Sequence, residues 1–212
     1  MTTQLTSAPT TTRVTRAGIL CIGGALVGVG GGLALAVIDP VVGLDRFSYP
    51  TGPVEFILFQ LAFALNHVLM LLGVLAVGWS GGFGVRRPGA VGLWISVVSL
   101  GALTLVELIG ATQAYEASPS SLSPIFDVAY PVLTLLILVG LLMLGVSVLR
   151  ERRWTSWRRW APLSTGLTLG LLALPGLALG FFWARIGLTL WVASFIVLGL
   201  ALMVEGAGGK RR

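Results

Sequence analysis

Charged residues are scarce in this sequence, because Asp, Glu, Lys and Arg together make up only 10% of its 212 residues. Soluble domains typically carry about 25% charged residues. Hydrophobic residues reach 56%, and the mean hydropathy is +0.95. A water-soluble fold of this size has too little interior to bury so much apolar surface, whereas a lipid bilayer solvates it. The composition therefore predicts an integral membrane protein.

Several residue types that carry chemistry occur only once. The single cysteine, Cys21, excludes an intramolecular disulfide and a cysteine metal cluster. The only lysine, Lys210, lies in the C-terminal tail, which excludes a retinal Schiff base within the membrane. The sequence also has no Walker A or H-E-x-x-H motif. We therefore predict no metal site and no catalytic residues, and the sequence identifies no cofactor.

Long apolar segments separate short polar ones along the chain. A helix needs about 20 residues to cross the hydrocarbon core. The predicted fold class is an all-α polytopic transmembrane helical bundle with six spans, at about 17–38, 56–79, 90–111, 125–149, 161–179 and 186–205. We expect a disordered cytoplasmic tail over residues 1–16, one transmembrane domain over 17–205, and a basic cytoplasmic tail over 206–212.

The division of the last two spans is the least direct of these predictions. From Pro162 to Val204 only Arg185 is charged, and one helix of that length would be about 60 Å long, twice the bilayer core. Pro175, Gly176 and Gly180 weaken a helix, so two spans joined by a tight hairpin fit better. We expect Arg185 itself to lie in the turn, at the membrane interface.

Positive charge is distributed unevenly between alternate loops. If the N-terminus is inside, cytoplasmic segments hold 12 of the 14 Lys and Arg residues, and external segments hold only Arg46 and Arg185. The positive-inside rule then predicts that both termini are cytoplasmic, in a bacterial plasma membrane. The net charge of +6 is explained by topology, so we predict no nucleic-acid partner. A rival interpretation of the first span is a secretory signal, with cleavage near Ala34-Leu35-Ala36.

Glu107 is the only acid well inside a predicted span. It lies about 25 Å from Ala90 at 1.5 Å per residue, in the outer third of the membrane. Intramembrane acids usually face the bundle interior or a wet cavity. The residues on its side of the helix are small or polar, namely Gly92, Ser96, Ser99, Leu103 and Gly110. Glu107 is therefore a candidate proton, cation or ligand site, and the alternative is a hydrogen-bonded structural acid.

His67 is the only histidine, and it lies near the middle of the second span. Gln60 shares its helix face, and Asn66 precedes it. The three residues are candidates for a ligand or proton site with Glu107, since a short turn joins the two spans. The depths of His67 and Glu107 differ by about 9 Å along the membrane normal, so direct contact needs tilt or a water. The alternative for His67 is an interhelical hydrogen bond.

Two further patterns predict packing and lipid contact. Gly24, Gly28 and Gly32 have the small-xxx-small spacing that brings helices close together, either within this chain or in a homo- or hetero-oligomer. The segment Arg150–Trp160 is basic and rich in tryptophan. We expect it to bind anionic lipid at the inner face, through Trp154, Trp157, Trp160, Arg152, Arg153, Arg158 and Arg159.

Three functional hypotheses remain open from the sequence. The first is a non-catalytic accessory or binding subunit that associates with other membrane components. The second is a small proton- or ion-coupled transporter or channel that uses Glu107 and His67. The third is an intramembrane enzyme acting on a lipid or a quinone. Nothing in the sequence identifies a substrate.

Overall fold

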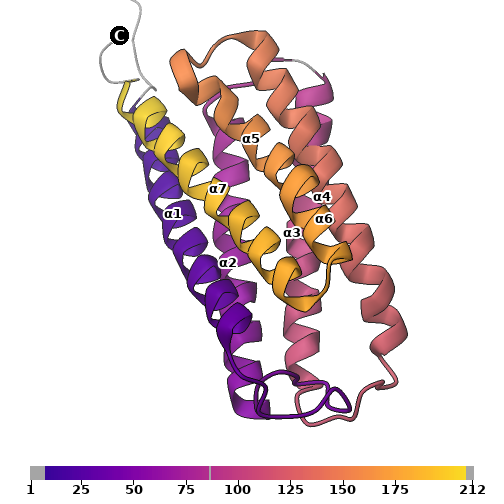
Figure 1. The fold of residues 1–212 in the computed structure, drawn as a ribbon. Helices are drawn as coiled ribbons and strands as arrows, with labels where there is room; N and C mark the ends of the chain where they lie inside the picture. The colour runs from indigo at the N-terminus through magenta and orange to yellow at the C-terminus, as the bar shows by residue number, and fades with distance from the viewer. Residues whose placement is uncertain (1–7, 86, 209–212) are drawn as a thin grey trace, which may run out of the picture.

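The computed structural model describes residues 8–85 and 87–208, and these residues are helical apart from short connections (Figure 1). The long helices are α1 (Ala8–Val37), α2 (Pro53–Trp79), α3 (Arg87–Thr112), α4 (Ser123–Glu151) and α7 (Phe181–Gly208). Between α4 and α7 lie four short segments, the 3₁₀ helix η1 (Ser156–Trp160), α5 (Ala161–Thr168), the π-helical η2 (Leu169–Ala173) and α6 (Leu174–Ala178).

Within the described residues, six helical segments are long and apolar enough to cross a membrane, as predicted. The fifth of these segments, Ser156–Ala178, consists of η1, α5, η2 and α6 in succession. Each helix packs against its neighbours in the chain, and α7 returns to pack against α1, so the helices form a closed ring. Large apolar side chains such as Leu26, Val98 and Leu171 are exposed on its outside, where lipid would cover them.

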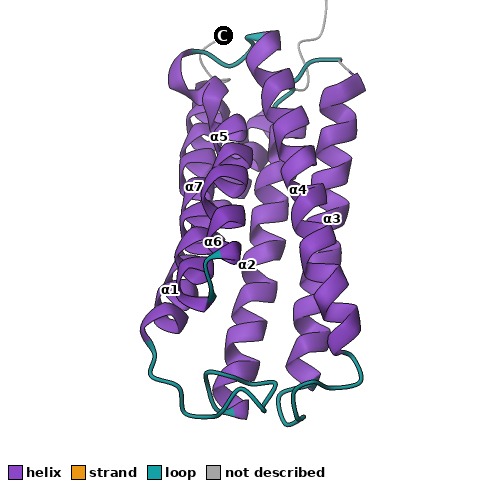
Figure 2. Ribbon diagram, turned by 45° about the vertical axis from the view of Figure 1, so that its right-hand side comes forward, coloured by secondary structure: helices purple, strands orange, loops and turns teal. Residues whose placement is uncertain are grey.

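Apolar side chains fill the interior of the ring at the end of the bundle where α7 ends. Met70 of α2, Leu100 of α3, Leu141 of α4 and Phe195 of α7 are almost completely buried there. The opposite end carries the α1–α2 and α3–α4 loops, and Figures 1 and 2 show it at the bottom. We call it the outer end, following the orientation that the charges predict.

The first helix begins earlier than the predicted span. Residues 8–16 belong to α1, although the sequence predicted a disordered tail there. Residues 1–7 lie outside the described part of the chain. Val14 and Ala17 are buried, and Arg13 stacks on the ring of Trp79 at 3.7 Å. These contacts with the bundle explain why the Thr-rich segment extends the helix. Similarly, α7 continues to Gly208, and residues 209–212 lie outside the description.

The fifth and sixth spans are separated at Leu179-Gly180, where the predicted fifth span ends, and α7 begins at Phe181, five residues earlier than the predicted sixth span. Gly180 has a φ of +100°, a conformation that side chains other than glycine rarely adopt. Pro175 has no amide hydrogen for the carbonyl of Leu171, which lies in the π-helical segment η2. The hairpin is short, and Figures 1 and 2 both show the α6–α7 turn well short of the outer loops.

The predicted glycine stripe lies on the faces of α1 that meet α2 and α7. A Cβ atom added to Gly24 would lie 2.5 Å from Leu69 Cβ, and one on Gly28 would lie 2.8 Å from both Asn66 and Val192. A Cβ on Gly32 would overlap Thr189. Both α2 and α7 belong to this chain, so the glycine stripe packs against helices of the same molecule.

Candidate intramembrane binding site

A cavity of about 440 Å³ lies inside the ring toward the outer end. Its volume is within the range of about 300–1,000 Å³ that is typical of small-molecule sites. Residues from α1, α2, α3, α4, α6, α7 and the α1–α2 loop line it. The cavity includes all four predicted site residues, Gln60, Asn66, His67 and Glu107.

Glu107 is held by side chains from two neighbouring helices. The hydroxyl of Tyr130 in α4 donates to its carboxylate Oε2 at 3.1 Å, and Gln60 Nε2 donates to its backbone carbonyl at 3.5 Å. Gly110 makes room for that amide, since a Cβ there would lie 2.5 Å from Gln60 Nε2. The small and polar stripe beside Glu107 is buried against the other helices, as predicted. The carboxylate is therefore oriented by Tyr130 and lies at the cavity wall.

Three residues that line the cavity each carry a buried side-chain atom with no hydrogen-bond partner among the described residues. These atoms are Asn66 Oδ1, His67 Nδ1 and Trp191 Nε1. Asn66, His67 and Trp191 are only 1%, 6% and 3% exposed, so bulk water does not solvate these atoms. The interhelical hydrogen bond that was the alternative for His67 is therefore not formed at Nδ1. Buried polar groups without partners are rare in folded proteins and call for a specific explanation.

Arg185 also lines the cavity, which corrects its predicted place in an external turn. The chain turns at Gly180, so Arg185 belongs to α7 and is drawn into the bundle by the short hairpin. Its guanidinium lies 5.0 Å from the centre of the Phe181 ring. Arg185 attracts the carboxylate of Glu107, but the two do not form an ion pair within 4 Å. The cavity thus separates one positive from one negative group.

Aromatic side chains of the α1–α2 loop cover the outer end of the cavity. The ring of Phe47 lies 5.8 Å from Phe56 in α2 and 5.3 Å from Phe126 in α4. The ring of Tyr49 lies 5.7 Å from Phe181 at the start of α7. Backbone hydrogen bonds join this loop to the α3–α4 loop, from Phe47 to Glu116 and from Ser118 to Asp45. The cavity is therefore roofed by a loop anchored to three helices.

His67 and Glu107 share this cavity, and the structure shows no hydrogen bond between them. The sequence interpretation missed Tyr130, Arg185 and Trp191. The sequence did offer a signal that could have identified Arg185 as a site residue, because it is the only charged residue in the 43 residues from 162 to 204. The described residues contain no group of three His, Cys, Asp or Glu side chains arranged to hold a metal.

The predicted lipid-binding segment divides into buried and exposed residues. Trp154 is 2% exposed and packs beside Gly82 of the α2–α3 turn, so its predicted contact with lipid is corrected. The three-residue spacing does not keep the tryptophans on one face, because a regular helix begins only at Ser156. Trp157 and Trp160 are 47% and 49% exposed. Arg152 and Arg153 are exposed beside them.

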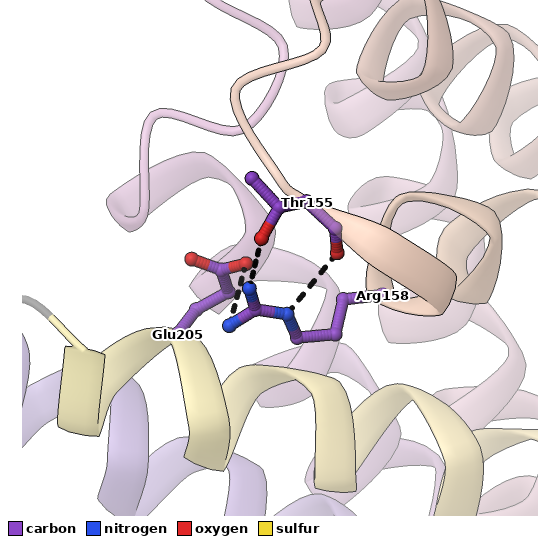
Figure 3. A network of polar contacts seen from close by, with 3 residues as sticks. All are labelled: Thr155, Arg158 and Glu205. Carbon is purple, nitrogen blue, oxygen red and sulfur yellow. Dashed lines mark hydrogen bonds and ion pairs between the residues drawn. The ribbon is translucent and has the colours of Figure 1, made fainter.

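Arg158 makes contacts within the protein (Figure 3). Its guanidinium lies 3.2 Å from Glu205 near the end of α7, and it donates to the backbone and hydroxyl oxygens of Thr155. Arg159 is partly buried and has its Nε enclosed by the protein. Arg158 therefore ties the α4–α5 connection to α7, and the exposed positive charge of the segment comes mainly from Arg150, Arg152 and Arg153.

No protein-family model, curated protein sequence or solved structure matches this chain. The proposed function therefore rests on the cavity and on the residues that line it.

Proposed function

We propose that this chain is an integral membrane protein that binds a small amphipathic molecule in the outer half of the bilayer. It would act as a binding or accessory component and not as a catalyst. The observation that supports the proposal is a cavity of about 440 Å³ whose lining residues include three with a buried, unpartnered polar atom, Asn66, His67 and Trp191.

Leaving the polar part of this wall without partners is energetically costly. Each buried polar group without a partner costs about 1–3 kcal/mol relative to the same group in water. A ligand that supplies hydrogen bonds removes that cost. Water alone would pair with the polar side chains but would leave the apolar part of the wall in contact with water. A molecule with an apolar body and a few polar groups matches both parts of the wall.

We propose the same orientation as the charge distribution predicts, with both termini cytoplasmic and the chain in the plasma membrane. The exposed residues Arg152, Arg153, Trp157 and Trp160 support this, since Arg and Trp are typical of an interface with anionic lipid. In this orientation the cavity faces the outer leaflet.

Filling the cavity is expected to remove the bound molecule. Ala184 lines the cavity, and Ala184→Phe places a ring inside it without deleting a polar group. We expect small molecules that copurify with the wild-type protein in mild detergent to be depleted by at least about tenfold in this variant. Native mass spectrometry and analysis of the extracted molecules provide the measurement.

The matched control is Ala34→Phe, because Ala34 is exposed on α1 near the same end of the bundle. This variant should retain the copurifying molecules at the wild-type level. Equal retention by wild-type protein and a well-folded Ala184→Phe variant would contradict the proposal.

A second candidate function, transport, is favoured by the discontinuous fifth span. Interrupted helices are typical of transporter binding sites, and here η2 and Pro175 interrupt the span opposite α7. If the bound molecule enters proteoliposomes that contain the wild-type protein faster than it enters empty liposomes, transport is the better description. Binding without flux supports the accessory function.

A further inference from the structure

The two charged groups of the cavity lie on different helices, Glu107 on α3 and Arg185 on α7, and this separation indicates the class of ligand. We propose that the cavity takes a zwitterion, a molecule with an ammonium group and a carboxylate or phosphate group on an apolar body. The inference rests on the proposed binding function. It adds that the ammonium group faces α2 and α3, and that the oxyanion faces α7.

The wall formed by α2 and α3 offers acceptors. Glu107 contributes a carboxylate that uses one hydrogen bond, from Tyr130, and a carboxylate can accept several. Asn66 contributes a carbonyl oxygen without a donor. His67 Nδ1 accepts when the proton of the neutral ring is on Nε2. An ammonium group carries three donors, which these acceptors would pair.

The wall formed by α7 offers donors. Trp191 Nε1 can only donate, and no acceptor reaches it. The guanidinium of Arg185 carries five N–H donors in a planar fork that suits carboxylate and phosphate oxygens. Among the described residues, no acceptor makes a hydrogen bond or ion pair with this guanidinium, which lies over the Phe181 ring. A ligand oxyanion would supply the missing acceptors.

The charges in the cavity wall favour a ligand with no net charge. Glu107 and Arg185 are the only acid and the only Lys or Arg among its lining residues, and His67 is the only other ionisable base there. A ligand with a single charge would leave either Glu107 or Arg185 unpaired in an apolar setting, where unpaired charge is expensive. A zwitterion pairs both.

The remaining wall accommodates the apolar body. Aromatic rings from the loop and from three helices surround the polar groups, among them Phe47, Phe56, Phe63, Tyr130 and Phe181. Two sources supply the required chemistry, a free amino acid with an aromatic or aliphatic side chain and a zwitterionic phospholipid headgroup with its upper acyl chains.

Three probes that share one phenyl ring test the charge requirement. The wild-type protein in mild detergent is titrated with L-phenylalanine, phenethylamine and 3-phenylpropionate, and binding is followed by calorimetry. A second arm compares short-chain phosphatidylethanolamine with phosphatidylglycerol, which lacks the ammonium group. We expect a zwitterion from at least one arm to bind about 10- to 100-fold more tightly than its singly charged partners. The arm that shows this preference identifies the source.

Two substitutions test which wall holds which charge. Glu107→Gln should favour 3-phenylpropionate or phosphatidylglycerol over the matched zwitterion, because the acidic partner is gone. Arg185→Gln should shift the preference toward phenethylamine. If a variant does not fold, the wild-type comparison still decides the question.

Equal binding of zwitterionic and singly charged probes in both arms, or no binding of any of them, would overturn the inference. Such a result leaves the binding function intact if Ala184→Phe still loses a copurifying molecule of another class. If Ala184→Phe loses nothing, the binding function fails as well.

Discussion

Gly92→Ala is expected to destabilise the bundle strongly, by about 1–3 kcal/mol or more. A Cβ atom on Gly92 would lie 2.7 Å from the carbonyl oxygen of Gly140 and 2.7 Å from the backbone nitrogen of Leu144. Both are backbone atoms of α4, so α3 and α4 would have to separate along their contact. The measurement is thermal unfolding in mild detergent, together with the yield of folded protein.

Gly30→Ala is the control for this substitution. Nothing lies within 4 Å of a Cβ atom on Gly30, although this residue belongs to the same glycine-rich helix as the packed stripe. Alanine is favoured over glycine in helix interiors by about 0.5–1 kcal/mol, so this variant should be as stable as the wild type or more stable. Equal stability of the Gly92 and Gly30 variants would show that α3 and α4 are not in close backbone contact.

Asn66→Leu is expected to stabilise the ligand-free protein and to abolish ligand binding. The Oδ1 atom of Asn66 is buried without a donor, and leucine has a similar shape without a polar group. Removing an unsatisfied buried acceptor should contribute about 1–3 kcal/mol. Thermal unfolding of ligand-free protein should therefore shift upward, while native mass spectrometry should show loss of the copurifying molecule.

A buried hydroxyl that is already satisfied provides the comparison. Ser147 Oγ donates to the carbonyl of Met143 at 2.8 Å, far along α4 from the cavity. Ser147→Ala should leave ligand retention unchanged and should not raise stability. If Asn66→Leu instead lowers stability, Asn66 acts as a structural hydrogen-bonding residue and the explanation for its unpartnered atom is wrong.

The number of segments long and apolar enough to span a membrane was predictable because it depends on local properties. Apolar length and the prolines and glycines between runs are local to each helix, and they located all six segments. The boundaries were harder, since α1 gains a turn or more from contacts of Val14 and Arg13 with the rest of the bundle. Such contacts join residues that are far apart in the sequence.

Only the side of the candidate site that α2 and α3 form was predictable from the sequence. Helix periodicity placed Gln60, Asn66 and His67 on one element and Glu107 on another, and a short turn brings those elements together. Periodicity could not show that α7 lies opposite them, because α7 meets α1 only through ring closure. Arg185 was misplaced for a related reason, since the position of the hairpin turn depended on Gly180 and not on the charge.

A similar limit applies to Trp154. Its spacing from Trp157 and Trp160 predicts one face of a helix, but the chain leaves helical geometry after Glu151 and has a positive φ at Arg152. This break turns Trp154 into the protein, beside Gly82.

An experimental structure of the wild-type protein in lipid nanodiscs tests the central claim most directly. It should show density for a non-protein molecule in the cavity, within hydrogen-bonding distance of Asn66 Oδ1 and Trp191 Nε1 and between Glu107 and Arg185. A collapsed cavity in which these side chains bond to one another, or a cavity that contains only ordered water, would contradict it.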